Sequence, residues 1–359
     1  MNKATLIALV TVPLLLLLCC SGGAYFTLSG LLPFGEDSWR HYSGGGMFVS
    51  DSPSLSADGS QIVFATPFSG HGDVYVADVL TGVATRLTNT DEFESSPYFL
   101  PGSRQVVFQR ERPPCRHIWL LDLQTGQERQ LTRGQVLDDV SSLSPNGKQL
   151  LIWRSTNRGN GRGVKPHLVE VNSDTTKQIK GVVQAVFGDG GSSPWATWEG
   201  TGEELGQVTL DGQRSPPVGK GWIIDVSDKA GMALFMHLGT AGSGPNRELF
   251  CLSVTSGSEQ SVGVGHSARV FANGKVLYFV GYEHQAMIWE WNEKPRAITS
   301  PPGYKVYSNR SDQGNAAALF VMPPNEPSRQ YGIFLFDADT EAFRQIEITY
   351  SEGDLGREL

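Results

Sequence analysis

Seven basic side chains in two neighbouring stretches are the residues of this sequence whose type and spacing could do chemistry. They are Arg110, Arg112, Arg116, Arg154, Arg158, Arg162 and Lys165. Guanidinium and ammonium groups gathered on one rim would bind an anionic partner, such as a glycan, a peptide carboxylate or an acidic protein patch. Acidic residues occur nearby: Asp91, Glu92, Glu94, Asp138 and Asp139. The alternative interpretation is therefore that these charges pair with one another and with water.

Catalytic and metal-binding patterns give weaker signals. The histidines are spread along the chain: His41, His71, His117, His167, His237, His266 and His284. They form no HxH or HxxxH pair, although metal ligands from separate segments need no local spacing. The cysteines form no CxxC pattern: Cys19, Cys20, Cys115 and Cys251. The chain also lacks the G-x-S-x-G motif of serine hydrolases. We therefore predict no catalytic residues, no metal and no cofactor.

A repeat indicates the elements that must position these side chains. Turn glycines recur every 40 to 45 residues, each between two short strand-like runs: Gly59, Gly102, Gly147, Gly190, Gly231, Gly274 and Gly314. The second half of each unit reads as a further hairpin, as in "DVYVADVLTGVATRLT" and "HIWLLDLQTGQERQLT". A period near 40 with two hairpins per unit is typical of a β-propeller. The sequence predicts an all-β, seven-bladed propeller of four-stranded antiparallel blades over residues 49–350, rather than sandwich strands with accidental spacing.

The amino-acid sequence of the repeat resembles that of a known protein family. The stretch "SADGSQIVFATPFSGHGDVYVADVLTGVATRLT" resembles the repeat of TolB-like propellers, also called WD40-like or PD40 repeats. Units one to three match well, and units four to seven match in outline, the fourth least. The resemblance implies a propeller that makes protein contacts at the cell envelope.

Propeller geometry suggests where a site would lie. Connections between second and third strands, and between consecutive blades, open on one face, which we call the loop face. The hairpin turns lie on the other, the turn face. The seven basic residues fall on the loop face of units two and three, where connections are long and varied. Because the first unit begins with its innermost strand, we expect ring closure without strand exchange between the chain ends.

The N-terminus favours export. Residues 1–29 are almost uncharged and apolar after Lys3, which is enough to span a bilayer. Lys3 before this segment, with Glu36 and Asp37 after it, places the remainder outside the cytoplasm. An uncleaved anchor, a cleaved signal peptide and a lipoprotein anchor at Cys19 or Cys20 remain open. Residues 30–48 read as a linker and residues 351–359 as a C-terminal tail.

The net charge and the motifs together reduce the number of function classes that fit this sequence. A net charge of −8 argues against a nucleic-acid binder. We predict a non-catalytic, membrane-anchored propeller, periplasmic or extracellular, that binds a protein or other envelope component. If the N-terminus is cleaved, the protein is secreted. The alternative is a propeller enzyme acting on glycans, a lyase or hydrolase, with its site on the loop face.

Overall fold

The computed structural model divides the chain into two units, Met1–Gly45 and Gly46–Leu359. The residues that it describes all lie in the second unit: 53–66, 72–156, 164–191, 193–200, 204–209, 213–237, 247–281, 284–310, 314–322 and 332–350. The predicted anchor, linker and tail therefore lie outside the described residues. Within those ranges no helix has the length and apolar character needed to cross a bilayer.

The described residues are all-β, as predicted, and their strands form seven consecutive antiparallel units, which we call sheets. Hydrogen bonds join the second unit to the third and the fifth to the sixth, so the strands make five continuous sheets. The first contains β1 (Ser54–Leu55), β2 (Gln61–Thr66), β3 (Asp73–Asp78) and β4 (Val83–Arg86). The second contains β5 (Phe93–Phe99), β6 (Gln105–Arg112), β7 (Cys115–Asp122) and β8 (Glu128–Gln130). The third contains β9 (Leu137–Leu143), β10 (Gln149–Ser155), β11 (Lys165–Glu170) and β12 (Thr175–Gln178).

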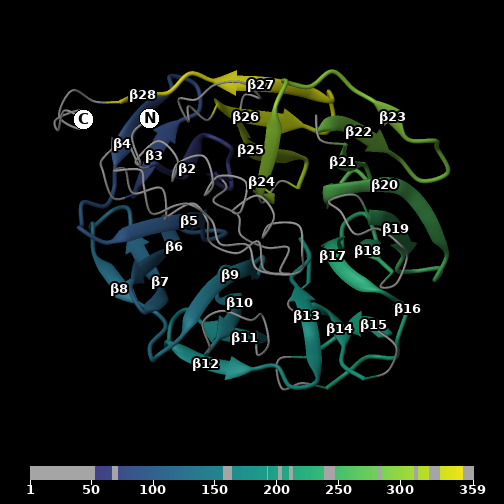
Figure 1. The fold of residues 1–359 in the computed structure, drawn as a ribbon, viewed down its shortest axis with the longest axis horizontal. Helices are drawn as coiled ribbons and strands as arrows, with labels where there is room; N and C mark the ends of the chain where they lie inside the picture. The colour runs from purple at the N-terminus through teal and green to yellow at the C-terminus, as the bar shows by residue number, and fades with distance from the viewer. Residues whose placement is uncertain are drawn as a thin grey trace, which may run out of the picture. The chain divides into compact units, whose positions relative to one another are not determined.

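The remaining four sheets repeat this pattern and follow one another around a common centre (Figure 1). The fourth contains β13 (Val182–Val186), β14 (Trp195–Trp198), β15 (Glu204–Gln207) and β16 (Gly219–Lys220). The fifth contains β17 (Trp222–Ser227), β18 (Met232–Met236), β19 (Arg247–Ser253) and the first half of β20 (Glu259–Val270). The sixth contains the second half of β20, β21 (Val276–Val280), β22 (Gln285–Trp289) and β23 (Arg296–Ala297). The seventh contains β24 (Tyr304–Arg310), β25 (Ala316–Met322), β26 (Gly332–Asp337) and β27 (Ala342–Ile346).

Local turn chemistry explains why each unit folds in this way. Six of the seven repeat glycines have φ between 64° and 84°, a conformation that L side chains rarely adopt. In the first unit Ser56 Oγ accepts from Gln61 N at 2.9 Å, and its hydroxyl donates to Asp58 at 2.6 Å. In the third unit Ser144 and Asn146 make the same contacts. The side chains of the "SADG" and "SPNG" stretches therefore hold their own turns.

The fourth unit departs from this pattern, as its weak match predicts. Gly190 does not adopt a positive φ. Its turn is held instead from the fifth sheet, where the Asp228 carboxylate accepts from Gly190 N at 3.2 Å, Gly191 N at 2.9 Å and Trp195 Nε1 at 3.1 Å.

One apolar cluster fills each boundary between neighbouring sheets among the described residues. The boundary of the first and second sheets contains Val63 and Phe108, for example, and that of the sixth and seventh contains Phe279 and Phe336. The cluster of Ile62, Tyr75, Phe320 and Ile333 joins the seventh sheet to the first. Each sheet thereby buries both faces against its two neighbours, which no single four-stranded sheet could do.

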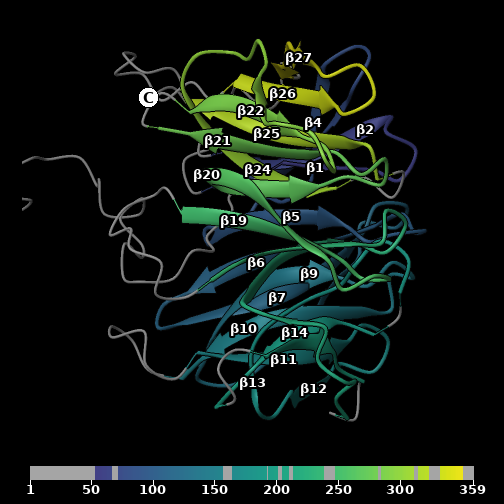
Figure 2. The ribbon, with the colours of Figure 1, turned by 90° about the vertical axis from the view of Figure 1, so that its right-hand side faces the viewer.

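The innermost strands are also joined by hydrogen bonds at a fixed offset. A backbone N–H donates to a side chain 45 residues earlier in three places: Phe99 to Ser54 (3.4 Å), Phe187 to Ser142 (2.9 Å) and Val270 to Asp225 (3.0 Å). Seen from the side, the sheets lie in succession (Figure 2). Because neighbouring strands are antiparallel, the short hairpin turns fall on the turn face and the connections between second and third strands fall on the loop face.

The closure of the sheets differs from the expectation. The C-terminal segment supplies a further strand, β28 (Thr349–Tyr350), which pairs in parallel with β4 on the outside of the first sheet. Thr349 N donates to Gly82 O at 2.9 Å, and the Tyr350 ring meets Tyr75 edge-on at 5.4 Å. A side-chain hydrogen bond links Tyr350 with Thr66, and burial raises the pKa of Tyr350 to about 12. The strand that follows the seventh sheet is therefore added outside the first, a feature that the hairpin repeat does not encode.

Candidate ligand rim on the second and third sheets

The structure places the predicted rim residues at the loop-face ends of four strands. Arg110 and Arg112 lie on β6, Arg116 on β7, Arg154 on β10 and Lys165 on β11. Arg158 and Arg162 lie outside the described residues. All five described cations are ion-paired with carboxylates, which matches the alternative that the sequence left open.

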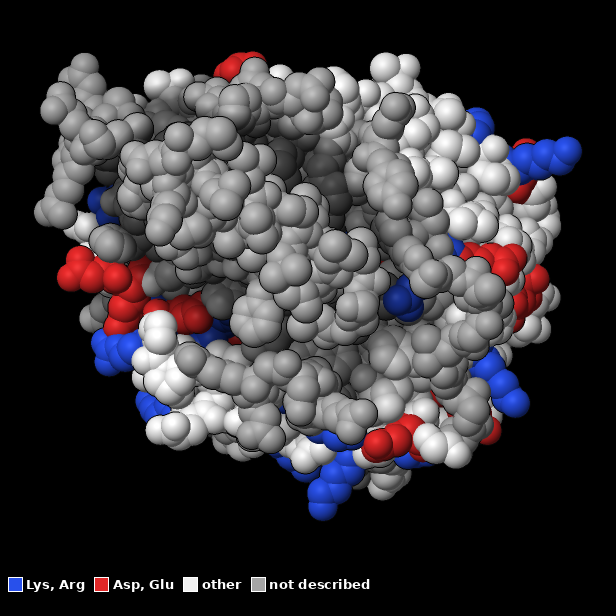
Figure 3. Space-filling model, in the orientation of Figure 1, with Lys and Arg blue, Asp and Glu red and all other residues white. Residues whose placement is uncertain are grey.

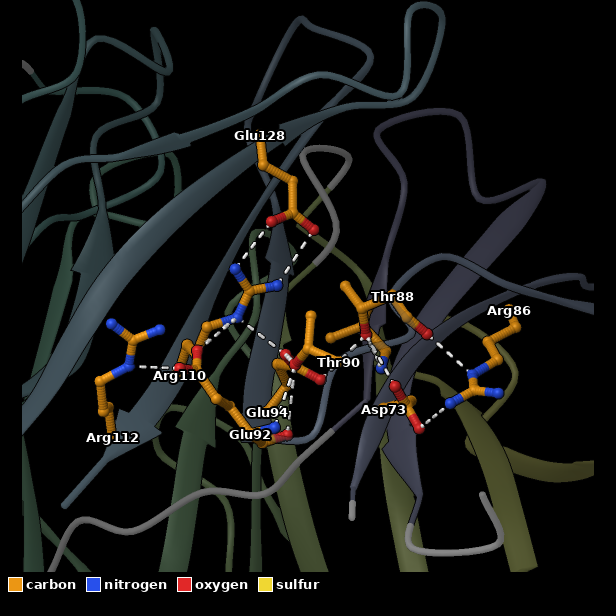
Figure 4. A network of polar contacts seen from close by, with 10 residues as sticks. Asp73, Arg86, Thr88, Thr90, Glu92, Glu94, Arg110, Arg112 and Glu128 are labelled. Carbon is orange, nitrogen blue, oxygen red and sulfur yellow. Dashed lines mark hydrogen bonds and ion pairs between the residues drawn. The ribbon is translucent and has the colours of Figure 1, made fainter. Parts of the chain in front are cut away.

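Arg110 is buried, and its guanidinium lies between the carboxylates of Glu94 and Glu128 (Figure 4). Its Nε donates to Glu94 Oε1 at 2.7 Å, and its two terminal nitrogens donate to Glu128 at 2.7 and 3.0 Å. The rings of Phe108 and Trp119 lie 5.1 and 4.6 Å from its Cζ. Cation–π contacts and paired carboxylates together offset the loss of hydration of this charge.

Glu94 continues this chain of contacts into the first sheet. Its side chain is fully buried and accepts hydrogen bonds from Thr90 at 2.5 Å and Thr88 at 3.1 Å. Thr88 also donates toward the buried Asp73, which pairs with Arg86 at 2.7 Å. Desolvation raises the pKa of Glu94, while Thr90 and Arg110 oppose that shift. The series of hydrogen bonds and ion pairs from Arg86 to Glu128 therefore joins the first sheet to the second.

The third sheet repeats the arrangement. Arg110 faces Glu94 across the strand pair in the second sheet, and Arg154 faces Asp138 in the third. Arg154 donates twice to the fully buried Asp138, both at 2.7 Å, in a bidentate pair. Arg110 and Arg154, which the sequence predicts on a ligand rim, thus form equivalent buried ion pairs in the second and third sheets.

Arg116 bridges the second and third sheets. Its guanidinium pairs with Asp139 on β9 and lies 3.3 Å from Glu111. Burial raises the pKa of Asp139, an effect that the charge of Arg116 opposes. Arg116 therefore stabilises the contact between these sheets and is not presented to solvent.

The exposed charge of the rim is limited. Arg112 is 80% exposed and pairs with Glu92, and Lys165 is 37% exposed and lies 3.2 Å from Glu199. On the face seen in Figure 3, described basic and acidic side chains lie beside one another. Among the described rim cations, Arg112 and Lys165 are therefore the two that an anion in solution can reach.

The histidines show one grouping that sequence spacing does not reveal. His117, His167 and His237 each hydrogen-bond locally, to Gly134 O, Lys165 O and Glu259. His266 and His284 meet with ring centroids 4.4 Å apart, although 18 residues separate them. The structure describes no group of three or more His, Cys, Asp or Glu side chains arranged to hold a metal ion. His266 lies at a register shift of β20 against β21, which leaves no pattern in the sequence.

The fold and this arrangement define a β-propeller whose second and third sheets have ion-paired strand ends on the loop face. Residues 45–198 match the family model PD40, the TolB beta propeller domain. The Tol-Pal system protein TolB of Francisella tularensis subsp. mediasiatica is 30% identical over 83 residues, which cover 23% of this chain and 19% of that protein. TolB of strain SCHU S4 matches to the same extent. Residues 45–198 thus carry a PD40 TolB β-propeller domain, and the similarity to the TolB proteins spans about a fifth of their length.

Solved structures agree on the fold. TolB from Acinetobacter baumannii superposes with a TM-score of 0.50 at 15% identity, covering 81% of this chain and 64% of that one. An oligogalacturonate lyase in complex with manganese gives 0.58 at 12% identity, covering 79% and 87%. A puromycin hydrolase gives 0.59 at 13% identity, covering 85% and 55%. At these identities the similarity establishes a shared architecture alone.

Proposed function

We propose that this chain is an exported, membrane-anchored, seven-bladed propeller without catalytic activity, which binds a protein or other envelope component through its loop face. The match of residues 45–198 to the TolB propeller domain carries the proposal. The apolar N-terminal segment supports export and anchoring, because a stretch of this length and composition can enter a bilayer.

The ion pairs support a binding role because they fix the points from which the loop-face connections depart. Arg110, Arg116 and Arg154 are each held by carboxylates where a strand meets a connection. A rigid base lowers the conformational entropy that a loop loses on binding. In this proposal the paired arginines form the scaffold, and Arg112, Arg158 and Arg162 provide the charges that a partner can reach.

Capture from solubilised envelope with the intact protein tests the proposal. The test variant is Arg158→Ser/Arg162→Ser, which removes two charges from the β10–β11 connection. Arg154 stays intact, because its loss would leave Asp138 buried without its partner. The matched control is Lys148→Ser/Lys177→Ser, which removes two exposed charges elsewhere on the third sheet.

The proposal predicts a specific component retained by the wild-type protein and the control and lost from the test variant. Equal retention by all three would show that this connection is not the binding site. Failure to retain any component, together with cleavage of acidic oligosaccharides by the purified protein, would contradict the non-catalytic proposal.

A protease-accessibility assay on intact cells and spheroplasts tests the export. We expect the propeller to be cleaved only when it is reached from the extracytoplasmic side, and to remain with the membrane fraction. Protection until the cytoplasmic membrane is broken would contradict an exported propeller.

A further inference from the structure

Two of the repeat turns share the tripeptide Asn-Gly-Lys. Residues Asn146–Lys148 form the turn of the third sheet, and residues Asn273–Lys275 form that of the sixth. An asparagine that precedes glycine can lose its side-chain amide, because glycine leaves the next backbone nitrogen unobstructed. Since the tripeptides are identical, the two asparagines have closely matched intrinsic reactivity, and a difference in the folded protein comes from its structure. A third such pair, Asn160 and Gly161, lies outside the described residues.

The backbone of the two turns is held in the same way. Gly147 N donates to Ser144 O at 2.9 Å, and Gly274 N donates to a carbonyl oxygen, Phe271 O, at the same distance. Both glycines have positive φ, 67° and 84°, and both asparagines are exposed to solvent. The nitrogen that would attack must therefore leave an equivalent hydrogen bond in either turn, so the backbone favours neither site.

The side chain of Asn273 is tied to the seventh sheet. Its Nδ2 donates to Ala338 O at 3.2 Å and to Asp339 Oδ1 at 2.9 Å. Its backbone N–H donates to Asn315 Oδ1 at 3.0 Å, and Asn315 Nδ2 donates in turn to Asp339 at 3.1 Å. Because Nδ2 would depart as ammonia, the reaction at Asn273 must first break two hydrogen bonds to the neighbouring sheet.

The side chain of Asn146 makes its contacts within its own turn. The Ser144 hydroxyl donates to Asn146 Oδ1 at 2.8 Å, and Lys148 N donates to the same oxygen at 3.0 Å. No described residue accepts a hydrogen bond from Asn146 Nδ2. Donors on the amide oxygen stabilise the negative charge that develops there when a nucleophile attacks Cγ. The contacts of Asn146 therefore favour the reaction that those of Asn273 oppose.

The first sheet shows that an aspartate fits this kind of turn. Asp58 there occupies the place of Asn146, with the Ser56 hydroxyl donating to its Oδ1 at 2.6 Å and Ser60 N at 3.0 Å. Hydrogen bonds from Ser56 and then from Ser60 lower the pKa of Asp58 to about 2. A carboxylate at position 146 would accept from the equivalent serine hydroxyl and backbone N–H, so the turn suits the product as well as the amide.

We propose that Asn146 is a site of spontaneous deamidation on the turn face, and that its counterpart Asn273 is protected. Gly147 N forms a bond with Asn146 Cγ, and its proton leaves with Nδ2 as ammonia, which gives a succinimide ring. Water then breaks the new N–Cγ bond and restores the peptide with aspartate at position 146. The conversion adds one negative charge to the turn face and does not depend on the binding function proposed above.

A time course of the full-length protein at pH 8, followed by peptide mapping with mass spectrometry, tests the proposal. Trypsin places the three Asn-Gly pairs in separate peptides, and digestion with Asp-N protease distinguishes aspartate from isoaspartate. We expect Asn146 to convert about tenfold faster than Asn273, because two hydrogen bonds hold Nδ2 at the second site. In the urea-unfolded protein the two sites should convert at similar rates.

A substitution at the seventh sheet tests the cause of the protection. Asp339→Ala removes one acceptor of Asn273 Nδ2 and should raise the rate at Asn273 toward that at Asn146. Asp122→Ala is the matched control, because it removes a carboxylate that holds a hairpin turn of the second sheet and should change neither rate. Equal rates at the two sites of the folded wild-type protein would overturn the proposal. Conversion of both sites in urea with none at Asn146 in the folded protein would also overturn it.

Two further variants test whether the product fits its turn. Asn146→Asp should leave Tm close to that of the wild-type protein. Asn273→Asp should lower Tm by several degrees, because it places a carboxylate against Asp339 and removes the donor to Ala338. An equal loss of Tm in both variants would contradict the equivalence of the third turn with the first.

Discussion

Arg110 and Arg112, two residues apart on β6, show how much the surroundings decide the role of a charge. Arg110 is buried between two carboxylates and two aromatic rings, whereas Arg112 is 80% exposed beside Glu92. In the sequence the two residues look equivalent as rim candidates. The acidic stretches that would neutralise the rim were visible in the sequence, but the pairing of Glu94 with Arg110 and of Asp138 with Arg154 depends on strand register.

These surroundings predict a large difference between two substitutions. Arg110→Met should lower the free energy of unfolding by about 3 kcal/mol, because it leaves Glu94 buried without its cation. Arg112→Ala should leave stability close to wild type, because exposed ion pairs contribute little. Urea denaturation at pH 7 measures both changes. Equal effects of the two substitutions would contradict the assignment of Arg110 as the structural member.

Glu341 gives a pH-dependent prediction at the seventh sheet. Hydrogen bonds from Arg296 and Lys275 lower its pKa to about 2. The resulting stabilisation should be present above the ordinary value near 4.5 and lost as the pH falls toward 2. Glu341→Gln should therefore cost about 1 kcal/mol at pH 7, an amount reduced by solvent screening of the half-exposed Arg296. The cost should shrink toward pH 2, and denaturant titrations at both pH values test this trend.

At the scale of elements, the repeat predicts the strands well because six of the seven first turns carry a glycine at positive φ. Glycines at positive φ and Ser–Asp or Ser–Asn contacts recur with the period of the units. The fourth turn escaped the pattern because Asp228 of the next sheet holds it. The continuous β20, which leaves the fifth sheet and enters the sixth, also has no turn signal of its own. Long-range contacts of this kind are absent from a local pattern.

The strand β28 gives the clearest test of an element. Gly82 and Gly126 occupy equivalent hairpin turns with φ 72° and 70°. A Cβ on Gly82 would lie 1.8 Å from Glu347 O, whereas a Cβ on Gly126 would meet nothing within 4 Å. Both alanine variants bear the cost of the left-handed backbone, but only Gly82→Ala should displace β28 from β4.

We expect Gly82→Ala to reduce Tm by several degrees more than Gly126→Ala. Gly82→Ala should also expose Tyr350, so that its pKa returns from about 12 toward the ordinary tyrosine value of 10. Ultraviolet titration of tyrosine ionisation measures that shift. The same Tm and the same titration curve in both variants would show that β28 does not fasten the first sheet.

At the scale of the whole molecule, the two faces differ in construction. The turn face is built from short hairpins, and the loop face of the second and third sheets carries connections that leave from ion-paired strand ends. Each face has an exposed residue that can serve as a probe position. Arg112 lies at the loop-face end of β6, and Leu80, 90% exposed, lies on the turn face between β3 and β4. A partner bound through the loop face should be reached from the first position and not from the second.

Site-specific photo-crosslinking in intact cells therefore tests whether a partner binds through the loop face. A photoreactive side chain at position 112 should give a discrete adduct with an envelope component, and the same side chain at position 80 should give none. The adduct should weaken in the Arg158→Ser/Arg162→Ser background. An adduct from position 80 with none from position 112 would place the contact on the turn face and contradict the account.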